Sequence, residues 1–125
     1  MKMYKILVID DEKEIVDILE KFLAKKGYEV ISAYGGEEGI EKVISEKVDL
    51  VILDMKMPKV NGVEVLKVIH KKDKHPPVII LSGSLGMDKN IDTIKRLGYN
   101  KKDILIKPID LEELIRLIEE KLSNK

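Results

Sequence analysis

Five short apolar segments, each followed by a stretch with helical periodicity, constrain the fold of this chain more than any other feature. The segments are residues 5–9, 29–33, 49–53, 78–81 and 103–106. Short runs rich in Ile, Leu and Val are typical of strands that are buried on both faces of a parallel sheet. Because strands and helices alternate, the sequence predicts an α/β domain with an open five-stranded parallel sheet and helices on both faces. A closed barrel would need roughly 200 residues or more, and the chain has 125.

Five amphipathic helices are expected between and after these strands. They cover residues 12–26, 37–46, 63–72 and 87–97, followed by a last helix that Asp110 caps. Gly27 and Gly98 are expected to end two of them, because glycine readily adopts the left-handed conformation that follows a helix. Leu117 lies off the apolar stripe of the last helix, where it suits either the rim of the core or an exposed interface. The residues expected to face the sheet from the second helix are Ile40, Val43 and Ile44.

The composition narrows the classes of function. The chain has 23 basic and 23 acidic residues, so its net charge gives no general attraction to nucleic acid or membranes. It has no cysteine, which excludes disulfides and thiolate chemistry.

His70 and His75 have no ligand-spaced partner and are expected to be solvated, whereas Met55 and Met57 are expected to pack beneath a loop. No apolar run approaches 18 residues and no signal peptide precedes Tyr4, so we expect one soluble cytoplasmic domain over residues 1–125, with no effector domain.

Polar residues stand where four of the expected strands end. Asp10 and Asp11 follow the first strand, Asp54 the third, Ser82 the fourth and Lys107 the fifth. In an open parallel sheet, sites form outside the carboxyl ends of the strands, so these side chains are expected to converge at one edge. Each has a simpler explanation when taken alone. An aspartate or Ser82 could cap a helix or occupy a turn, and Lys107 could be an ordinary surface lysine.

Three carboxylates, a hydroxyl and an amine at one edge of a sheet can support phosphoryl transfer. Carboxylates that repel one another supply the hard oxygen ligands that suit a hydrated Mg²⁺ ion. Asp54, at the centre, can act as a carboxylate nucleophile and form an aspartyl phosphate. Lys107 can pair with a carboxylate when the site is empty and with a phosphoryl oxygen when it is filled, and Ser82 can donate a hydrogen bond to that oxygen. Positioning and charge neutralisation would then suffice without a general base.

The same residues follow the pattern of a known family. In chain order, the motifs are Asp10-Asp11, Asp54-x-x-Met57-Pro58-x-x-x-Gly62, Ser82-Gly83 and Lys107-Pro108. Over its whole length the sequence resembles a response-regulator receiver domain of two-component signalling, of the stand-alone type. The resemblance implies a flavodoxin-like, receiver-type fold with strand order 2-1-3-4-5.

The resemblance also implies a phosphoacceptor and a metal site. Asp54 would accept a phosphoryl group from a sensor histidine kinase or a phosphotransfer protein. Mg²⁺ would be held by Asp11, Asp54 and the backbone carbonyl of Lys56, with Asp10 acting mostly through water. Such a protein would assist its own phosphorylation and dephosphorylation and would not be a turnover enzyme.

Two further residues and a surface take their roles from the same resemblance. Ser82 would turn toward the phosphoryl group, and Lys107 would bind it, with a cis peptide bond to Pro108. The domain would then act on a downstream protein through the face formed by its fourth helix, fifth strand and fifth helix. Direct contact with nucleic acid or a membrane is not expected.

The sequence departs from the family pattern at several positions. The position three before Lys107, often Tyr or Phe in the family, is Ile104, and Tyr99 is the only aromatic residue near it. Gly83 leaves more open room than the usual alanine, and the segment 98–107 is about two residues longer than is usual. In the family, the positions two residues after Asp54 and two residues after Ser82 tune the lifetime of the phosphorylated state. They are Lys56 and Ser84 here, and no rate of dephosphorylation is predicted from them.

Two other classes of function stay open. An unphosphorylated pseudo-receiver, acting as a docking module, fits Ile104 but not the intact set of acids. A phosphohydrolase of the haloacid-dehalogenase type would carry a second aspartate two residues after its nucleophile, and that position is Lys56. A flavodoxin-type cofactor binder would need a phosphate-cradling loop and stacking aromatic residues, and the sequence has neither.

Overall fold

The computed structural model describes residues 3–83 and 90–123 and alternates strands with helices from end to end. The elements are β1 (Lys5–Ile9), α1 (Lys13–Lys25), β2 (Glu29–Ala33), α2 (Gly36–Ser45), β3 (Leu50–Asp54), α3 (Gly62–His70), β4 (Val78–Ser82), α4 (Ile91–Arg96), β5 (Ile104–Ile106) and α5 (Leu111–Ser123). The segment before β5 contains one 3-10 turn, Lys101–Asp103, whose capping box pairs Asn100 with Asp103. The start predicted for the fourth helix, at residue 87, lies outside the described residues.

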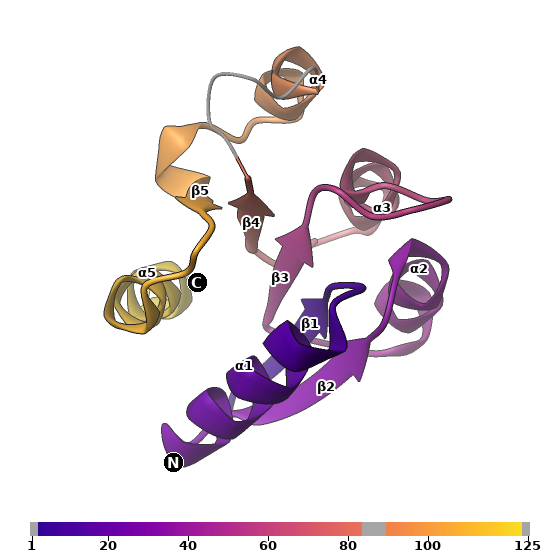
Figure 1. The fold of residues 1–125 in the computed structure, drawn as a ribbon. Coiled ribbons are helices and arrows are strands. Elements are labelled where there is room, and N and C mark those ends of the chain that lie inside the picture. Colours follow the sequence, from indigo (N-terminus) through magenta and orange to yellow (C-terminus); the bar gives the residue numbers. More distant parts are fainter. Residues whose placement is uncertain (1–2, 84–89, 124–125) are drawn as a thin grey trace.

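The five strands form one parallel sheet in the order β2-β1-β3-β4-β5, which confirms the expected fold class. Figure 1 shows α1 and α5 on one side of this sheet and α2, α3 and α4 on the other. The strand register aligns Ile9 with Leu53, Asp54 with Leu81 and Ser82 with Ile106. The carboxyl ends of β1, β3, β4 and β5 therefore meet at one edge of the sheet.

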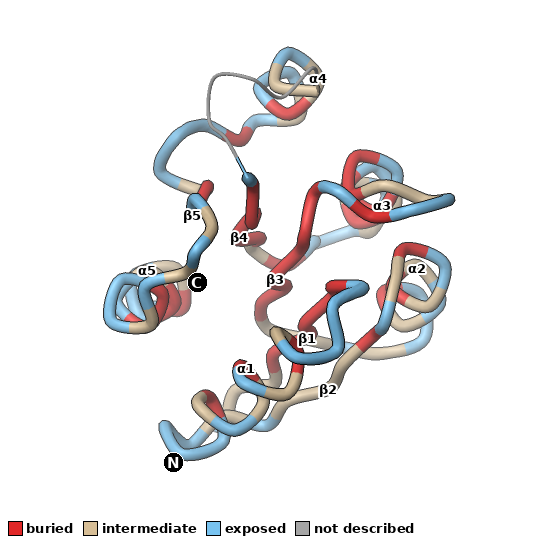
Figure 2. Tube along the Cα trace, viewed as in Figure 1, coloured by how far each residue is buried: buried red, intermediate tan, exposed pale blue. Residues whose placement is uncertain are grey.

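Two apolar layers hold the helices to the sheet, and alternate residues of each strand contribute to opposite layers. One layer joins Leu53 and Ile80 to α2, α3 and α4, and the other joins Ile52 and Ile79 to α1 and α5. Figure 2 shows the central strands as buried along their length and the helices as buried only where they face the sheet. Both layers reach the last residues of β3, so the polar residues that follow are fixed on a rigid support.

The orientation of α2 differs from the prediction. Val43 is buried and Ile40 half-buried as expected, but the side chain of Ile44 is 67% exposed. The helix instead approaches the sheet through glycine: a Cβ atom at Gly39 would lie 2.8 Å from Ile9 Cγ2. This close approach sets the rotation of α2, and Ile44 is turned to the outside.

The predicted helix ends are largely confirmed. Gly27 and Gly98 have φ angles of +93° and +97°, in the left-handed region, directly after their helices. Asp110 Oδ1 accepts hydrogen bonds from the N–H groups of Glu112 and Glu113, so it caps α5. Leu117 is half-buried and packs against the core, which is the rim position and not the exposed one. None of the helices in the described part of the chain has the length and apolar character that a membrane crossing requires.

Candidate functional site

The end of β1 buries a charged side chain. Asp10 is fully buried, and its Oδ1 accepts a hydrogen bond from the Glu12 N–H at 2.9 Å. Asp11, the next residue, is exposed. Helix capping, the simpler explanation that the sequence left open for an aspartate, does not apply to either residue, because the residue at the N-cap position of α1 is Glu12. Asp10 instead fixes the turn that leads into the helix and keeps its second oxygen for the site.

Asp54 is the last residue of β3 and is only 3% exposed. The Lys56 N–H donates to its Oδ1 over a long 3.4 Å. The loop that follows is fastened by a hydrogen bond from the Gly62 N–H to the Met55 carbonyl at 2.9 Å. Met55 and Met57 are buried beneath it, as predicted. The loop backbone is thereby held against the end of the strand that carries Asp54.

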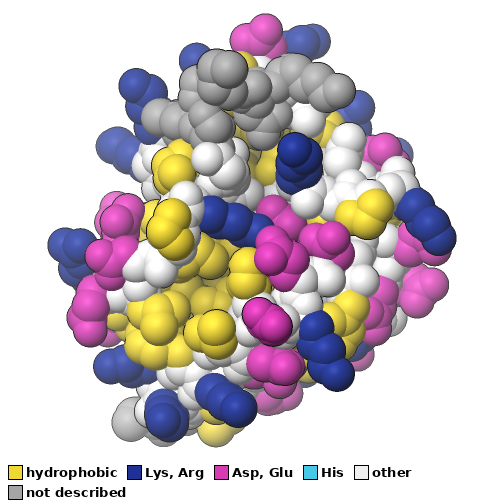
Figure 3. All heavy atoms as spheres, in the orientation of Figure 1, with side chains coloured by type: hydrophobic (Ala, Val, Ile, Leu, Met, Phe, Trp, Pro, Cys, Tyr) yellow, Lys and Arg dark blue, Asp and Glu magenta, His cyan; other side chains and the backbone are white. Residues whose placement is uncertain are grey.

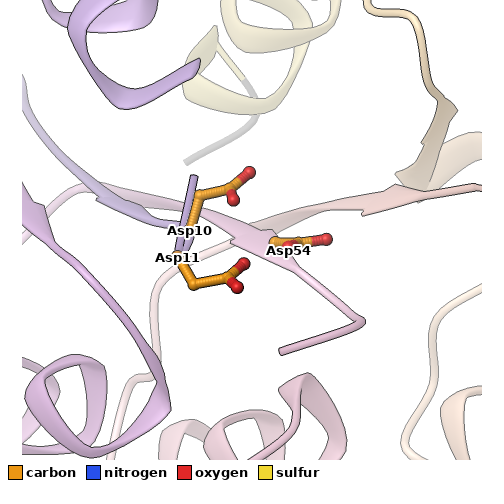
Figure 4. Close-up of side chains that lie close together, drawn as sticks. All are labelled: Asp10, Asp11 and Asp54. Atoms are coloured by element: carbon orange, nitrogen blue, oxygen red, sulfur yellow. The ribbon is translucent and has the colours of Figure 1, made fainter. Parts of the chain in front are cut away.

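Asp10, Asp11 and Asp54 converge, as the sequence predicts. Each offers a carboxylate oxygen, and these oxygens lie within 4.8 Å of one another. Figure 4 shows the three side chains pointing to the same side of the sheet edge, two from the end of β1 and one from β3. Within residues 3–83 and 90–123 no other group of three acidic or histidine residues is close enough to share a metal ion. A donor set made only of carboxylates suits a hard divalent cation such as Mg²⁺.

The pKa values of the two buried acids are both raised, chiefly by burial. Burial, followed by the neighbouring Asp10, raises the pKa of Asp54 from 3.8 to about 7. Burial also raises the pKa of Asp10, against the hydrogen bond from Glu12 and the charge of Lys107. Both shifts mean that ionising these carboxylates lowers the stability of the folded protein, and a bound cation would remove this loss.

Lys107 reaches this cluster from the end of β5. Its Nζ lies 3.4 Å from Asp10 Oδ2 and 3.3 Å from Asp54 Oδ1. Its backbone N–H donates to the Ser82 carbonyl at 2.8 Å, and its bond to Pro108 is cis, as expected. Burial alone would lower the pKa of Lys107, but Asp54 and Asp10 outweigh it and raise the pKa. The prediction that Lys107 pairs with carboxylates of the site is confirmed.

Ser82 ends β4, one residue beyond the register partner of Asp54, and its side chain is buried. Gly83 follows it and is exposed, and no described atom lies within 4 Å of the position that a Cβ would take there. The open room expected at Gly83 is therefore present. Ser84 lies outside the described residues.

The aromatic residue nearest to Ile104 in sequence is bound elsewhere. Ile104 is buried in the layer that faces α4. Tyr99 is also buried, but its hydroxyl is 2.6 Å from His70 Nε2, at the end of α3. His70 is thus half-buried and also packs on His75 at a ring distance of 4.2 Å, so the expectation that it is solvated is wrong, whereas His75 is exposed. β5 starts at Ile104 and runs toward the site, so Tyr99, which precedes the strand, lies on the side away from the site. Tyr99 therefore cannot take the place of an aromatic residue at position 104.

Sequence reasoning missed one residue of the site, Glu12. Its Oε1 lies 3.2 Å from Lys107 Nζ, which makes it a third carboxylate partner of that lysine. The available signal was the run of three acids, Asp10 to Glu12, of which the sequence pattern assigned only two.

Replacing Asp54 with Asn should stabilise the metal-free fold, and more at about pH 8 than at about pH 5. The pKa of Asp54, about 7 when folded against 3.8 ordinarily, means that the free energy of unfolding falls as the pH rises through this interval. Asparagine carries no such charge, so the gain should be about 2 kcal/mol larger at the higher pH. Urea unfolding in EDTA measures it, and an equal gain at both pH values would contradict the raised pKa.

Comparisons with known proteins agree with this geometry. The sequence profile of the response regulator receiver domain family matches residues 6–119. The response regulator ArlR of Staphylococcus aureus is 35% identical over 116 residues, which cover 93% of this chain and 51% of ArlR. The chain thus spans about half the length of the curated relatives it matches.

Solved structures extend the likeness over nearly the whole chain. A CheY-like receiver domain protein from Methanospirillum hungatei is 29% identical with a TM-score of 0.89, covering 98% of this chain and 96% of that one. The response regulator TrrA of Thermotoga maritima, solved in complex with Mg²⁺–BeF, is 34% identical with a TM-score of 0.82, covering 96% of this chain and all of that one (100%). On the profile match, the shared fold and the acidic pocket, the chain belongs to the response regulator receiver domain family of two-component systems.

Proposed function

We propose that this domain accepts a phosphoryl group on Asp54 from a phosphohistidine of a sensor histidine kinase or phosphotransfer protein. The observation that carries the proposal is a buried carboxylate at the centre of an acidic edge, with a lysine ammonium 3.3 Å away. The carboxylate can act as the nucleophile, and the ammonium group can neutralise negative charge on the incoming phosphoryl group.

The transfer forms one bond and breaks another. An Asp54 carboxylate oxygen attacks phosphorus as the bond from phosphorus to the imidazole nitrogen breaks. The electron pair of that bond stays on the ring nitrogen, and the product is an acyl phosphate. Lys107 offsets the negative charge of the phosphoryl oxygens, and Ser82 donates a hydrogen bond to one of them. No group of the chain has to remove a proton from the nucleophile at a pH above about 7, where Asp54 is mostly ionised even in the metal-free fold.

The residues present fit a Mg²⁺ ion. Asp11, Asp54 and the backbone carbonyl of Lys56 would hold it, and Asp10 would act mostly through bound water. When bound, the ion would neutralise charge on the phosphoryl oxygens and on the crowded carboxylates. The Mg²⁺–BeF complex of TrrA supports this reading.

The domain would act as a phosphoacceptor that assists its own phosphorylation and dephosphorylation, and not as a turnover enzyme.

We propose the face of α4, β5 and α5 as its surface for a downstream protein, since Ile106 of β5 is 42% exposed there. Figure 3 shows a further apolar patch over α1 and α5, beside acidic side chains. A hollow of about 360 Å³ lies in that region, lined by Ile18, Pro108 and Leu111 among others.

A second function, an unphosphorylated docking module, is favoured by one observation. Ile104 replaces the aromatic residue of the family pattern, and Tyr99 is bound to His70 instead. Such a module would have no need of Mg²⁺ at the acidic edge.

Incubating the purified domain with acetyl phosphate separates the two functions. With Mg²⁺ present, intact mass spectrometry should show the addition of one phosphoryl group to most of the protein, and EDTA should prevent it. Titration with Mg²⁺ alone should raise the melting temperature by several degrees, because the ion relieves the repulsion of Asp10 and Asp54. An unmodified protein that also fails to respond to Mg²⁺ would favour the docking module.

A further inference from the structure

We propose that Glu12 is a positioning residue, which holds Lys107 while Asp54 is unphosphorylated and must release it when the phosphoryl group arrives. The proposal rests on the proposed function. It assigns to Glu12 a control over the rate of phosphoryl uptake, exerted through Lys107 and not through contact with the phosphoryl group.

The contact joins two loops that are far apart in the sequence. Glu12 Oε1 accepts a hydrogen bond from Lys107 Nζ at 3.2 Å, and Asp10 Oδ2 accepts another at 3.4 Å. Lys107 Nζ lies at 3.3 Å from Asp54 Oδ1 as an ion pair. An ammonium group has three protons, so these carboxylates can occupy all of its donors.

The backbones at both ends of the contact are fixed. The Glu12 N–H donates to Asp10 Oδ1, and the Glu12 carbonyl accepts from the N–H groups of Ile15 and Val16 at 3.1 Å each. The Lys107 N–H is bound to the Ser82 carbonyl. Only the two side chains are therefore free to change partners.

Helix capping does not explain the side chain of Glu12. It stands at the N-cap of α1, where Ser, Thr, Asp or Asn would accept a hydrogen bond from the first turn. Glu12 makes no side-chain capping hydrogen bond to the described first turn of the helix. Its carboxylate is directed to Lys107 instead.

Burial decides which partner Lys107 gives up. The side chain of Asp10 is 0% exposed and that of Asp54 is 4% exposed, whereas that of Glu12 is 59% exposed. Losing Lys107 would leave a buried carboxylate without its cation, which is costly, but water can solvate Glu12 in its place. A phosphoryl group on Asp54 that competes for Lys107 will therefore displace Glu12 first.

The test compares three variants of the whole chain with wild type. Glu12→Gln removes the charge that holds Lys107. Glu12→Asp keeps the charge but shortens the side chain by one methylene, which draws the carboxylate back from its 3.2 Å contact with Lys107 Nζ. Glu14→Gln removes the same charge from the first turn of the same helix and serves as the matched control. Initial rates of uptake are measured with Mg²⁺ and subsaturating acetyl phosphate, and affinity is measured with beryllofluoride.

Glu12→Gln should take up phosphoryl about two- to fivefold faster and bind beryllofluoride more tightly by a similar factor, the size expected for a partly exposed ion pair. Glu12→Asp should behave like Glu12→Gln, and Glu14→Gln like wild type. The proposal is overturned if Glu12→Gln is unchanged or slower, or if Glu12→Asp matches wild type. A wild-type protein that takes up no phosphoryl group refutes the proposed function itself and this inference with it, so the two failures are distinguishable.

Discussion

Replacing Asp54 with Asn is expected to abolish phosphoryl uptake from acetyl phosphate, from nearly complete modification to none that can be detected. The carboxamide of asparagine is uncharged and is a poor nucleophile, so it does not form the acyl phosphate. The neighbouring acids should not take over. Asp10 directs Oδ1 to the Glu12 N–H and Oδ2 to Lys107, and Asp11 is exposed. Intact mass after incubation with Mg²⁺ and acetyl phosphate measures the result.

A carboxylate at the other end of the same strand provides the control. Asp49 precedes β3, and its Oδ2 accepts a hydrogen bond from the Lys5 N–H at 2.8 Å. Asp49→Asn keeps a carbonyl oxygen that can accept the same bond, and it should leave phosphoryl uptake unchanged. The assignment of Asp54 fails if Asp54→Asn is still modified to the level of wild type, because another residue must then be the acceptor. Unfolding is not a rival explanation, since Asp54→Asn is expected to be the more stable protein.

Gly62→Ala is expected to have the second large effect, on stability and on the site together. A Cβ atom at Gly62 would lie 2.7 Å from the Asp54 carbonyl oxygen and 2.7 Å from Met55 Cα. Both are backbone atoms where β3 passes into the loop, so they cannot rotate away as a side chain could, and relieving the clash strains the strand end that carries Asp54. We expect a loss of about 2–4 kcal/mol in the free energy of unfolding, the range for an overpacked site that cannot relax. Urea unfolding measures the loss.

Gly83→Ala is the matched control for this clash. No described atom lies within 4 Å of the added methyl group, so its stability should stay within about 0.5 kcal/mol of wild type. Gly62→Ala molecules that remain folded should also take up phosphoryl more slowly, because the backbone at Asp54 and Lys56 is displaced. Equal stability of the two variants would show that the loop of residues 55–62 yields more easily than its contacts indicate.

Much of the site could be predicted from the sequence because its residues occupy fixed positions on regular elements. Apolar runs that stop at Asp10 and Asp54 mark strands that end at those residues, and parallel strands end at the same edge. The position of Lys107 after the fifth run follows from the same rule. Pattern alone thus determined the fold class, the strand boundaries to within a residue or two, and the convergence of three acids and one lysine.

The rotation of a helix on the sheet was decided by packing. Ile40, Val43 and Ile44 all satisfy a helical period, yet only Val43 is fully buried. The close approach of Gly39 to Ile9 chooses the face of α2 that is covered. Hydrophobic periodicity shows which helix residues form an apolar face, but not how the helix is rotated about its axis when it packs on the sheet.

The electrostatics of the site also required the tertiary structure. The sequence determined that acids and a lysine meet at one edge of a parallel sheet, because periodicity marks the strand ends and parallel strands all end at the same edge. The order of the strands was implied by the family resemblance. The fold alone decided that Asp54 is buried with a pKa near 7 and that Glu12 pairs with Lys107, 95 residues away. Burial and ion pairing depend on which side chains from distant segments share a space, and no local pattern in the chain encodes that.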